Sequence, residues 1–253
     1  MNRKPRKKRL DVLVVERGWA DSRAKAQAMI LAGEVTVDGK RSDKPGLTVG
    51  ENAQIEARSR LQKFVSRGGF KLEGALEELH VPVEGRVCLD VGSSTGGFTD
   101  CLLQKRAQRV YAVDVNTDQL AWKLHKDPRV VRLKRNAREL QPDDLPEPVE
   151  IVVIDVSFIS VAKVLPGPSA CAKAGADFVI LVKPQFELER ESIGPGGIVR
   201  DPQLHATAIQ RVRDAVESLG LGFLEVTRSR LLGAEGNQEY FLHARKPPKV
   251  ESQ

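Results

Sequence analysis

The stretch LDVGSSTGGFTDCLL, residues 89–103, decides the fold of this 253-residue chain. It begins as a short apolar strand, passes through a glycine-rich turn between Gly92 and Gly97, and continues as an apolar helix. Such a turn lets the backbone approach a ligand at the carboxyl edge of a sheet. It spells neither the dinucleotide fingerprint GxGxxG nor the P-loop pattern GxxxxGK[ST]. A purely structural strand-to-helix turn is the alternative interpretation.

Strand and helix signals alternate on both sides of this turn. Short apolar runs separated by helix-length segments predict a parallel, doubly wound sheet, with strands at residues 86–92, 109–115, 130–133, 150–156 and 177–182. The end differs, because residues 222–232 and 238–246 read as two strands of a hairpin. A parallel sheet closed by an antiparallel strand resembles the Rossmann-like architecture of S-adenosylmethionine-dependent methyltransferases.

The cofactor follows from acidic residues at two strand ends. Asp90 precedes the turn, and Asp114 closes the next strand. A carboxylate at that position can accept hydrogen bonds from both hydroxyls of a ribose. With no phosphate-binding signature, S-adenosylmethionine is the expected cofactor. Its amino-acid end would lie along the turn and its adenine beside Asn136. The candidate cofactor-binding residues are Asp90, Gly92, Ser93, Ser94, Thr95, Gly96, Gly97, Phe98, Asp114, Asn136 and Asp155.

Four polar residues are expected at one edge of the sheet. Asp155 and Lys183 end two strands, and Glu239 begins the antiparallel strand, whose start lies at the same edge. Lys71 lies in the first turns of a helix that precedes the strand at 86–92, and that helix begins at the same edge. Each charged residue alone is compatible with a solvated strand end. Four such residues at one edge, beside the glycine-rich turn expected to bind the cofactor, indicate a catalytic group.

Residues 10–60 form a separate unit in this interpretation. They predict two helices and a hairpin with its turn at Asp38-Gly39. The second helix has Asp21 or Ser22 as N-cap, Gly33 as its stop, and Ala24, Ala28 and Leu31 as one apolar face. The run SRAKAQAMILAGEVTVDGK resembles the S4-type RNA-binding domain. That resemblance implies RNA contacts at Arg23, Lys25, Gln27 and Lys40, although Arg23 and Lys25 could also simply solvate the outer face of the helix.

The basic charge is concentrated near the start. Of a net charge of +6, the first nine residues contribute six Lys or Arg and no acid, and residues 58–71 hold five basic residues and no acid. A polyanion is the natural partner of such patches, with Arg6, Lys7 and Arg67 as further RNA-contact candidates. The expected division is a basic tail (1–9), an S4-type domain (10–60), a linker (61–66), a methyltransferase domain (67–247) and a tail (248–253).

The motifs in combination resemble one family. SRGGFKLEGAL, DVGSSTGGFTD, DVSFIS, VKPQFE, GGIVRDP and EYFLHARK are similar to the TlyA-type, FtsJ-like family of rRNA methyltransferases, also known as haemolysin A. The resemblance implies methylation of a cytidine ribose 2'-hydroxyl in ribosomal RNA, with S-adenosylmethionine and without a metal. It also implies a Lys-Asp-Lys-Glu tetrad of Lys71, Asp155, Lys183 and Glu239, in which Lys183 is either a general base or a hydrogen-bonding cation.

Other classes of protein fit less well. No apolar run approaches the roughly 20 residues of a membrane span, and no signal-type segment follows the first residues, so a cytoplasmic protein without a membrane partner is expected. Cys88, Cys101 and Cys171 show no metal or disulfide spacing and are expected to be buried thiols. A non-catalytic, ribosome-bound RNA-binding factor is the main alternative, and a membrane-lysing haemolysin is a weaker one. Phe98 and Trp122 are expected to be packing residues.

Overall fold

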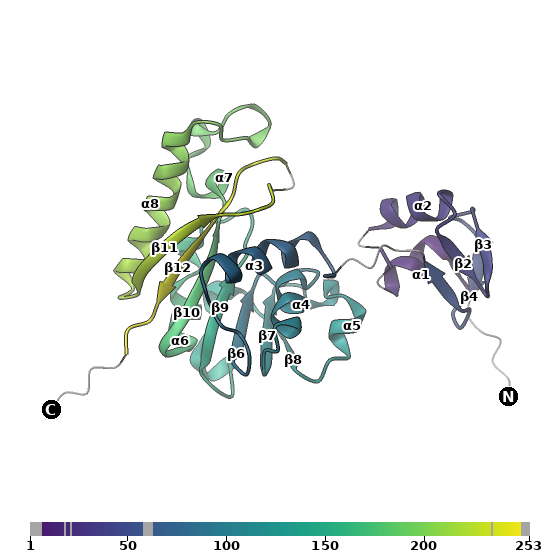
Figure 1. Cartoon of the computed structure of the whole chain (residues 1–253), viewed down its shortest axis with the longest axis horizontal. Coiled ribbons are helices and arrows are strands. Elements are labelled where there is room, and N and C mark those ends of the chain that lie inside the picture. The colour runs from purple at the N-terminus through teal and green to yellow at the C-terminus, as the bar shows by residue number, and fades with distance from the viewer. Residues whose placement is uncertain (1–6, 18, 21, 58–62, 234, 249–253) are drawn as a thin grey trace.

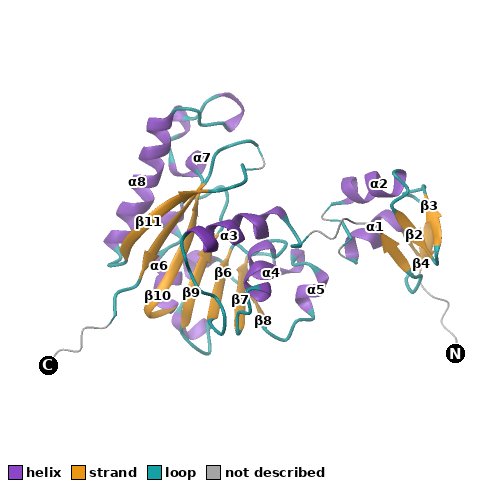
Figure 2. Ribbon diagram, viewed as in Figure 1, coloured by secondary structure: helices purple, strands orange, loops and turns teal. Residues whose placement is uncertain are grey.

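The computed structural model describes residues 7–17, 19–20, 22–57, 63–233 and 235–248. Figure 1 shows a small N-terminal unit in purple and blue and a larger unit that runs from blue through teal to yellow. Figure 2 shows that the larger unit is a central sheet with helices on both faces. The expected α/β fold with a small α+β domain in front is confirmed.

The small unit combines two helices with two short sheets. Ser22 caps α2, because its side chain accepts a hydrogen bond from Lys25 N at 3.3 Å, and Gly33 ends it with φ +68°. The hairpin turn is confirmed, since Asp38 and Gly39 both have positive φ, as a two-residue turn of this kind requires. Its elements are β1 Lys7–Arg9, α1 Leu10–Glu16, α2 Arg23–Leu31, β2 Val35–Val37, β3 Lys40–Ser42, β4 Thr48–Gly50 and β5 Ile55–Ala57, with β1 paired to β4 and the order β3-β2-β5 in the other sheet.

The buried face of α2 is a different one from the predicted face. Ala26, Met29 and Ile30 are buried against Leu10 and Val14 of α1, whereas Leu31 is 66% exposed. The prediction of Ala24, Ala28 and Leu31 as the packing face is therefore wrong. Asp21, the other candidate N-cap, lies outside the described residues.

Both ends of the small unit differ from the expected boundaries. Residues 7–9 of the expected tail form β1, which pairs antiparallel with β4. Phe64, in the expected linker, is 1% exposed and packs in the core of the larger unit. Folded structure therefore extends into the segments predicted as tail and linker. Lys8 is held by the pairing of β1 with β4, and Phe64 is held by burial in an apolar core.

The larger unit is built on a seven-stranded sheet of order β11-β12-β10-β9-β6-β7-β8. The strands from β10 to β8 are parallel, and β12 pairs antiparallel with both β10 and β11. The predicted closing hairpin is thus confirmed. The strands are β6 Val87–Val91, β7 Arg109–Asp114, β8 Val130–Lys134, β9 Val149–Ile154, β10 Ala172–Val182, β11 Gly222–Arg228 and β12 Tyr240–Arg245.

Two apolar cores lie on the two faces of this sheet. Alternate strand residues serve each face, so that Leu89 and Val91 pack in one core and Cys88 packs in the other. The first core includes α6 and α8, and the second includes α3 and α4. The helices are α3 Arg67–Glu78, α4 Gly97–Gln104, α5 Trp122–His125, α6 Pro166–Cys171, α7 Pro184–Glu187 and α8 Pro202–Ser218. Cys88, Cys101 and Cys171 are buried free thiols, as expected.

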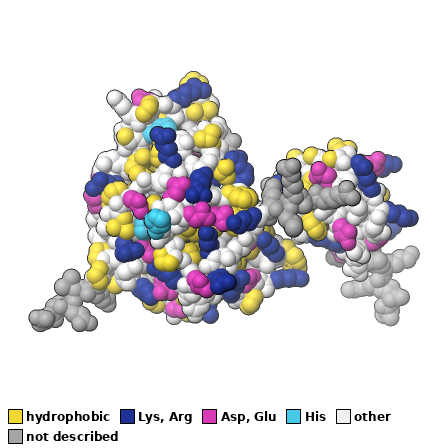
Figure 3. Space-filling model, viewed as in Figure 1, with side chains coloured by type: hydrophobic (Ala, Val, Ile, Leu, Met, Phe, Trp, Pro, Cys, Tyr) yellow, Lys and Arg dark blue, Asp and Glu magenta, His cyan; other side chains and the backbone are white. Residues whose placement is uncertain are grey.

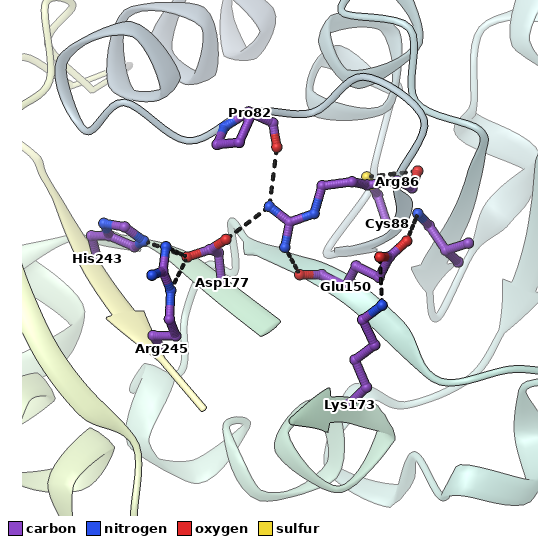
Figure 4. A network of polar contacts seen from close by, with 9 residues as sticks. Pro82, Arg86, Cys88, Glu150, Lys173, Asp177, His243 and Arg245 are labelled. Atoms are coloured by element: carbon purple, nitrogen blue, oxygen red, sulfur yellow. Dashed lines mark hydrogen bonds and ion pairs between the residues drawn. The ribbon is translucent and has the colours of Figure 1, made fainter. Parts of the chain in front are cut away.

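Buried charges connect the strands at the amino edge of the parallel sheet. Asp177, 2% exposed, accepts hydrogen bonds from Arg86 at 2.8 Å and from Arg245 at 2.8 Å, and His243 Nε2 lies 3.0 Å from it (Figure 4). Arg86 also donates to the Glu150 carbonyl at 2.6 Å. The hydrogen bonds from these three side chains outweigh burial, which by itself would raise the pKa of Asp177, and hold that pKa well below its usual range.

The face of the larger unit drawn in Figure 3 carries no large patch of one charge sign, because basic and acidic side chains are interspersed over it. Among the described residues, no helix is long and apolar enough to cross a bilayer. Within the same ranges, no three His, Cys, Asp or Glu side chains are grouped so that they could hold a metal ion.

Candidate active site

The order of the strands in the sheet places the predicted residues side by side along one edge. Tyr240 lies opposite Val182 in the antiparallel pair, so the preceding Glu239 lies opposite Lys183. Ile154 of β9 pairs with Val91 of β6, so Asp155 comes beside Gly92. From β12 to β8 the edge therefore carries the residues Glu239, Lys183, Asp155, Gly92, Asp114 and Asn136.

Lys183 and Asp155 form an ion pair at the centre of this edge. Lys183 Nζ lies 2.5 Å from Asp155 Oδ1 and 2.9 Å from Ser157 Oγ, and the lysine side chain is 10% exposed. A lysine can therefore follow the apolar strand β10, because Asp155 compensates its charge and Ser157 accepts a hydrogen bond from it, both from the loop after β9. A desolvated charge is stable in a fold only with such partners.

Lys71 and Glu239 form a second ion pair. Lys71 Nζ lies 2.5 Å from Glu239 Oε2, and their side chains are 11% and 3% exposed. Lys71 reaches this position from the second turn of α3, so that the pair connects α3 to the start of β12. The four predicted residues therefore occur as two cation–carboxylate pairs at the carboxyl edge.

The glycine-rich turn can form only with glycine at its tightest points. Gly92 has φ +84°, and a Cβ there would lie 2.2 Å from the carbonyl oxygen of Asp155. Gly96 has φ +93°, and a Cβ there would lie 2.2 Å from Leu124. Side chains are excluded at both positions, so the backbone of the turn packs directly against Asp155 and α5.

A cavity of about 180 Å³ joins this turn to both ion pairs. Lys71 and Asp155 line it together with the start of α3 and seven residues of the predicted cofactor set, counting Asp155: Gly92, Ser93, Ser94, Thr95, Gly97, Phe98 and Asp155. Arg67, predicted as an RNA contact, also lines it and donates to the carbonyl oxygen of Leu232 at 3.1 Å. One member of each ion pair thus shares this cavity with most of the cofactor candidates, whereas Lys183 and Glu239 are not among its lining residues.

The polar atoms of this region fit the amino-acid end of S-adenosylmethionine. Asp90 Oδ1 and Ser93 Oγ are buried and have no hydrogen-bond partner among the described residues. Asp90 Oδ2 accepts from Thr99 Oγ1 at 2.6 Å. Burial raises the pKa of Asp90 to about 7, against the hydrogen bond from Thr99, which lowers it. An ammonium group on the ligand would supply the missing donor to Asp90.

Asp114 and Asn136 are held by local hydrogen bonds. Asp114 accepts from the backbone N–H of Ser94 at 2.9 Å and of Asn116 at 3.0 Å, which fixes the carboxylate beside the turn. Asn136 caps a short 3-10 helix, Ala137–Glu139, by accepting from Arg138 N at 3.1 Å. Asp90, Gly96, Asp114 and Asn136 are not among the residues that line the 180 Å³ cavity.

The two aromatic predictions have different outcomes. Phe98 is 3% exposed and packs against Phe241, with ring centroids 6.1 Å apart, so it is a packing residue as expected. Trp122 is 53% exposed, and Lys126 Nζ lies over its ring at 4.8 Å from the centroid. The prediction that Trp122 is a packing residue is contradicted by this exposure, which leaves about half of the indole at the surface of the four-residue helix α5.

The candidate RNA contacts in the small unit are partly engaged in holding it together. Arg23 and Gln27 donate to Asp11 Oδ2 at 3.1 Å and 2.8 Å, and Asp11 is fully buried. The hydrogen bond from Arg9 and those from Gln27 and Arg23 keep the pKa of Asp11 well below its usual range, although burial opposes this. Lys7 in β1 and Lys40 in β3 are exposed, and Lys25 lies in the first turn of α2. Arg6 lies outside the described residues.

Two further residues at the carboxyl edge were not predicted as site residues from the sequence. Ser157 contacts Lys183, and it lies three residues after the end of β9, within the motif DVSFIS. Glu187, 5% exposed, binds Ser160 Oγ at 2.5 Å and Val161 N at 2.8 Å. A sequence does not reveal that a glutamate in a surface-type segment is buried.

Comparison with known proteins assigns both units. Residues 64–246 match the FtsJ-like methyltransferase family, and residues 8–55 match the S4 domain. The chain is 47% identical over 242 residues to the 16S/23S rRNA (cytidine-2'-O)-methyltransferase TlyA of Mycobacterium tuberculosis, which covers 95% of this chain and 90% of that protein.

Solved structures agree. A Streptococcus thermophilus protein provisionally named a hemolysin has a TM-score of 0.72 at 38% identity, covering 98% of this chain and 92% of that one. A Listeria monocytogenes protein, provisionally named an S-adenosylmethionine dependent methyltransferase, has a TM-score of 0.53 at 12% identity over 71% of this chain and 98% of that one, a likeness of fold alone. With both domains matched in this order, the chain belongs to the TlyA-type family of FtsJ-like methyltransferases that carry an N-terminal S4 domain.

Proposed function

We propose that this protein transfers a methyl group from S-adenosylmethionine to the ribose 2'-hydroxyl of a cytidine in ribosomal RNA. The observation that carries the proposal is the Lys183–Asp155 ion pair, whose Asp155 lines one cavity with the glycine-rich turn and Lys71. The TlyA relative, named for this reaction, supports the choice of substrate. The S4 domain supports an RNA or ribosomal-subunit partner.

In this proposal the cofactor lies along the turn, with its ammonium group on Asp90 and its ribose hydroxyls on Asp114. When bound, S-adenosylmethionine supplies an electrophilic methyl group. The residues of the chain fit it because Asp90 and Ser93 each present a buried oxygen that lacks a partner among the described residues. No metal is part of the proposal.

Lys183 is the group proposed to act on the ribose hydroxyl. Two of its possible N–H donors are directed to Asp155 and Ser157, which leaves one position of the amine for the 2'-oxygen. Lys183 can accept the hydroxyl proton there, or it can donate a hydrogen bond that orients the oxygen and stabilises its developing negative charge. Asp155 fixes the amine, while the Lys71–Glu239 pair positions α3 beside it.

The test is transfer of labelled methyl from S-adenosylmethionine to separated, unmodified ribosomal subunits, followed by nuclease mapping. Lys183→Ala is expected to abolish transfer, and cofactor binding measured by calorimetry is expected to persist. The matched control is Lys173→Ala, because Lys173 lies near the start of β10, at the end of the strand opposite to Lys183, and pairs with Glu150 at 2.6 Å. Lys183→Arg separates the two roles, since arginine keeps the hydrogen-bonding cation but cannot accept the proton.

The outcomes separate the alternatives. Label on a ribose 2'-oxygen that is lost in a folded Lys183→Ala variant supports the reaction. If the protein binds the cofactor but transfers no methyl group to either subunit, its substrate would be an RNA other than ribosomal RNA. Wild-type protein that binds ribosomal subunits but neither binds nor uses the cofactor would instead make it a non-catalytic RNA-binding factor.

A further inference from the structure

Glu187 connects the two loops that carry the central ion pair. Asp155 begins the loop after β9, and Lys183 begins the segment after β10, which continues as α7 and ends at Glu187. The Glu187 carboxylate reaches back to the first loop, where it accepts hydrogen bonds from Ser160 Oγ at 2.5 Å and from Val161 N at 2.8 Å. The side chain is buried, so water does not compete for these bonds.

The two loops are therefore joined at two points. The Lys183–Asp155 ion pair joins their beginnings, and the bonds from Glu187 join them four to six residues later along each chain segment. Between the two connections lies Phe158, which has φ +64°, a conformation that costs energy for a residue with a side chain. Such a loop keeps its shape only if contacts outside it hold it in place.

Glu187 is itself held by α8. Arg211 Nη1 donates to the Glu187 carbonyl oxygen at 2.7 Å, and the backbone of α7 is closed by Phe186 N donating to the Lys183 carbonyl oxygen at 2.9 Å. The glutamate is thus a fixed point from which the position of the Asp155 loop can be set. Ser157, the second partner of Lys183, lies in the part of the loop that this connection closes.

We propose that Glu187 is a positioning residue for methyl transfer, which holds Asp155 and Ser157 on Lys183 by fixing the loop after β9. It does not touch the reacting atoms in this scheme. The inference rests on the proposed function, and it concerns the turnover step more than cofactor binding, because the hydrogen bonds of Glu187 go to Ser160, Val161 and Arg211 and not to the turn at residues 92–97.

The test compares Glu187→Ala and Glu187→Gln in the methyl-transfer assay with the full-length protein. We expect Glu187→Ala to lower kcat about tenfold to a hundredfold, since small misplacements of catalytic groups have effects of this size. The KM for S-adenosylmethionine should change less than about twofold. Glutamine can accept from Val161 N and donate to Ser160 Oγ, so Glu187→Gln should recover kcat to within about threefold of wild type.

The matched control is Glu189→Ala, two residues further on. Glu189 is a glutamate in the same segment, but its side chain is 75% exposed and lies 3.3 Å from Arg211 Nη1 at the surface. Its removal should leave kcat unchanged. Equal kcat for Glu187→Ala and wild type would overturn the inference, as would a loss in Glu187→Ala that glutamine does not recover.

A second variant protects the test against misfolding. If Glu187→Ala does not fold, Ser160→Ala removes one of the two bonds while leaving the buried carboxylate with Val161 N, and a kcat equal to that of wild type would then overturn the inference. If the wild-type protein transfers no methyl group, the proposed function fails rather than the role of Glu187. The two failures are thus distinguishable.

Discussion

At the scale of single residues, Asp90 links stability to pH. It is fully buried beneath the glycine-rich turn, and burial raises its pKa to about 7. Because the folded chain binds this proton more tightly than the unfolded chain does, stability falls as pH rises from the usual aspartate pKa of 3.8 towards 7. Each unit of such a shift corresponds to about 1.4 kcal/mol.

Asp90→Asn should remove this dependence, since asparagine resembles the neutral acid and does not titrate. We expect the thermal midpoint of the variant, relative to wild type, to be higher at about pH 8 than at about pH 5, by an amount on the order of several degrees. Differential scanning fluorimetry across this range measures it. If the thermal midpoints of the two proteins changed in parallel with pH, this would contradict the raised pKa assigned to the buried Asp90.

Sequence reasoning located the site residues better than their contacts. Asp155, Lys183 and Glu239 could be placed because a strand end has a fixed edge once the topology is known. The pairing of each carboxylate with its lysine depends on side-chain geometry, which cannot be predicted from the sequence. In α2, the stripes Ala24, Ala28, Leu31 and Ala26, Met29, Ile30 both have helical spacing, so only packing against α1 decides which is buried.

At the scale of elements, the Lys71–Glu239 pair fastens α3 to the start of β12. Removing Lys71 leaves Glu239, 3% exposed, as an uncompensated buried charge. Lys71→Ala should therefore lower the free energy of unfolding of the larger unit by about 3–5 kcal/mol. Urea titration followed by circular dichroism is the measurement.

The double variant Lys71→Met, Glu239→Gln removes both charges while keeping side-chain volume. It should recover most of the lost stability, because neutral side chains avoid the desolvation cost, yet it should not transfer methyl groups. A stable and fully active double variant would show that this pair holds the fold and takes no part in the reaction.

Element prediction succeeded where strands are long and buried on both faces. The runs at β6, β7 and β9 are mostly apolar and buried, which is typical of parallel strands. The three-residue strands β1, β4 and β5 carry no periodic signal, because alternation cannot be recognised in so few residues. β10 begins at Ala172, five residues earlier than predicted, since its start includes Lys173 and Gly175 and an irregular pairing with β9.

At the scale of the whole molecule, the two edges of the central sheet carry buried aspartates of opposite character. At the carboxyl edge, Asp90 has a raised pKa and an oxygen without a partner among the described residues, as suits a ligand site. At the amino edge, Asp177 is bonded to side chains on either side of it, which connects the loop before β6 to β10 and β12. The sheet thus combines a stabilising amino edge with a carboxyl edge where buried polar atoms lack partners among the described residues, as expected of the edge that carries the proposed site.

Asp177→Asn should separate the two roles. The pKa of Asp177 is lowered in the folded chain, so its contribution to stability is present above the usual aspartate pKa of 3.8 and is lost as pH falls through and below that value. At neutral pH we expect the variant to lose about 1–3 kcal/mol, because Arg86 and His243 lose a charged hydrogen-bond partner. The difference from wild type should shrink as the pH approaches about 3.

The control is Asp214→Asn on α8, an exposed aspartate that accepts from Gln210 at 2.7 Å, whose substitution should change stability by less than about 0.5 kcal/mol. Urea titrations across the pH range, together with methyl-transfer rates well below the melting temperature, test the separation. Because Asp177 lies at the edge opposite Lys183, kcat of the folded variant should equal that of wild type. A reduced kcat in a fully folded Asp177→Asn variant would mean that the amino edge influences the ion pairs through the strands, and that the two edges are coupled rather than independent.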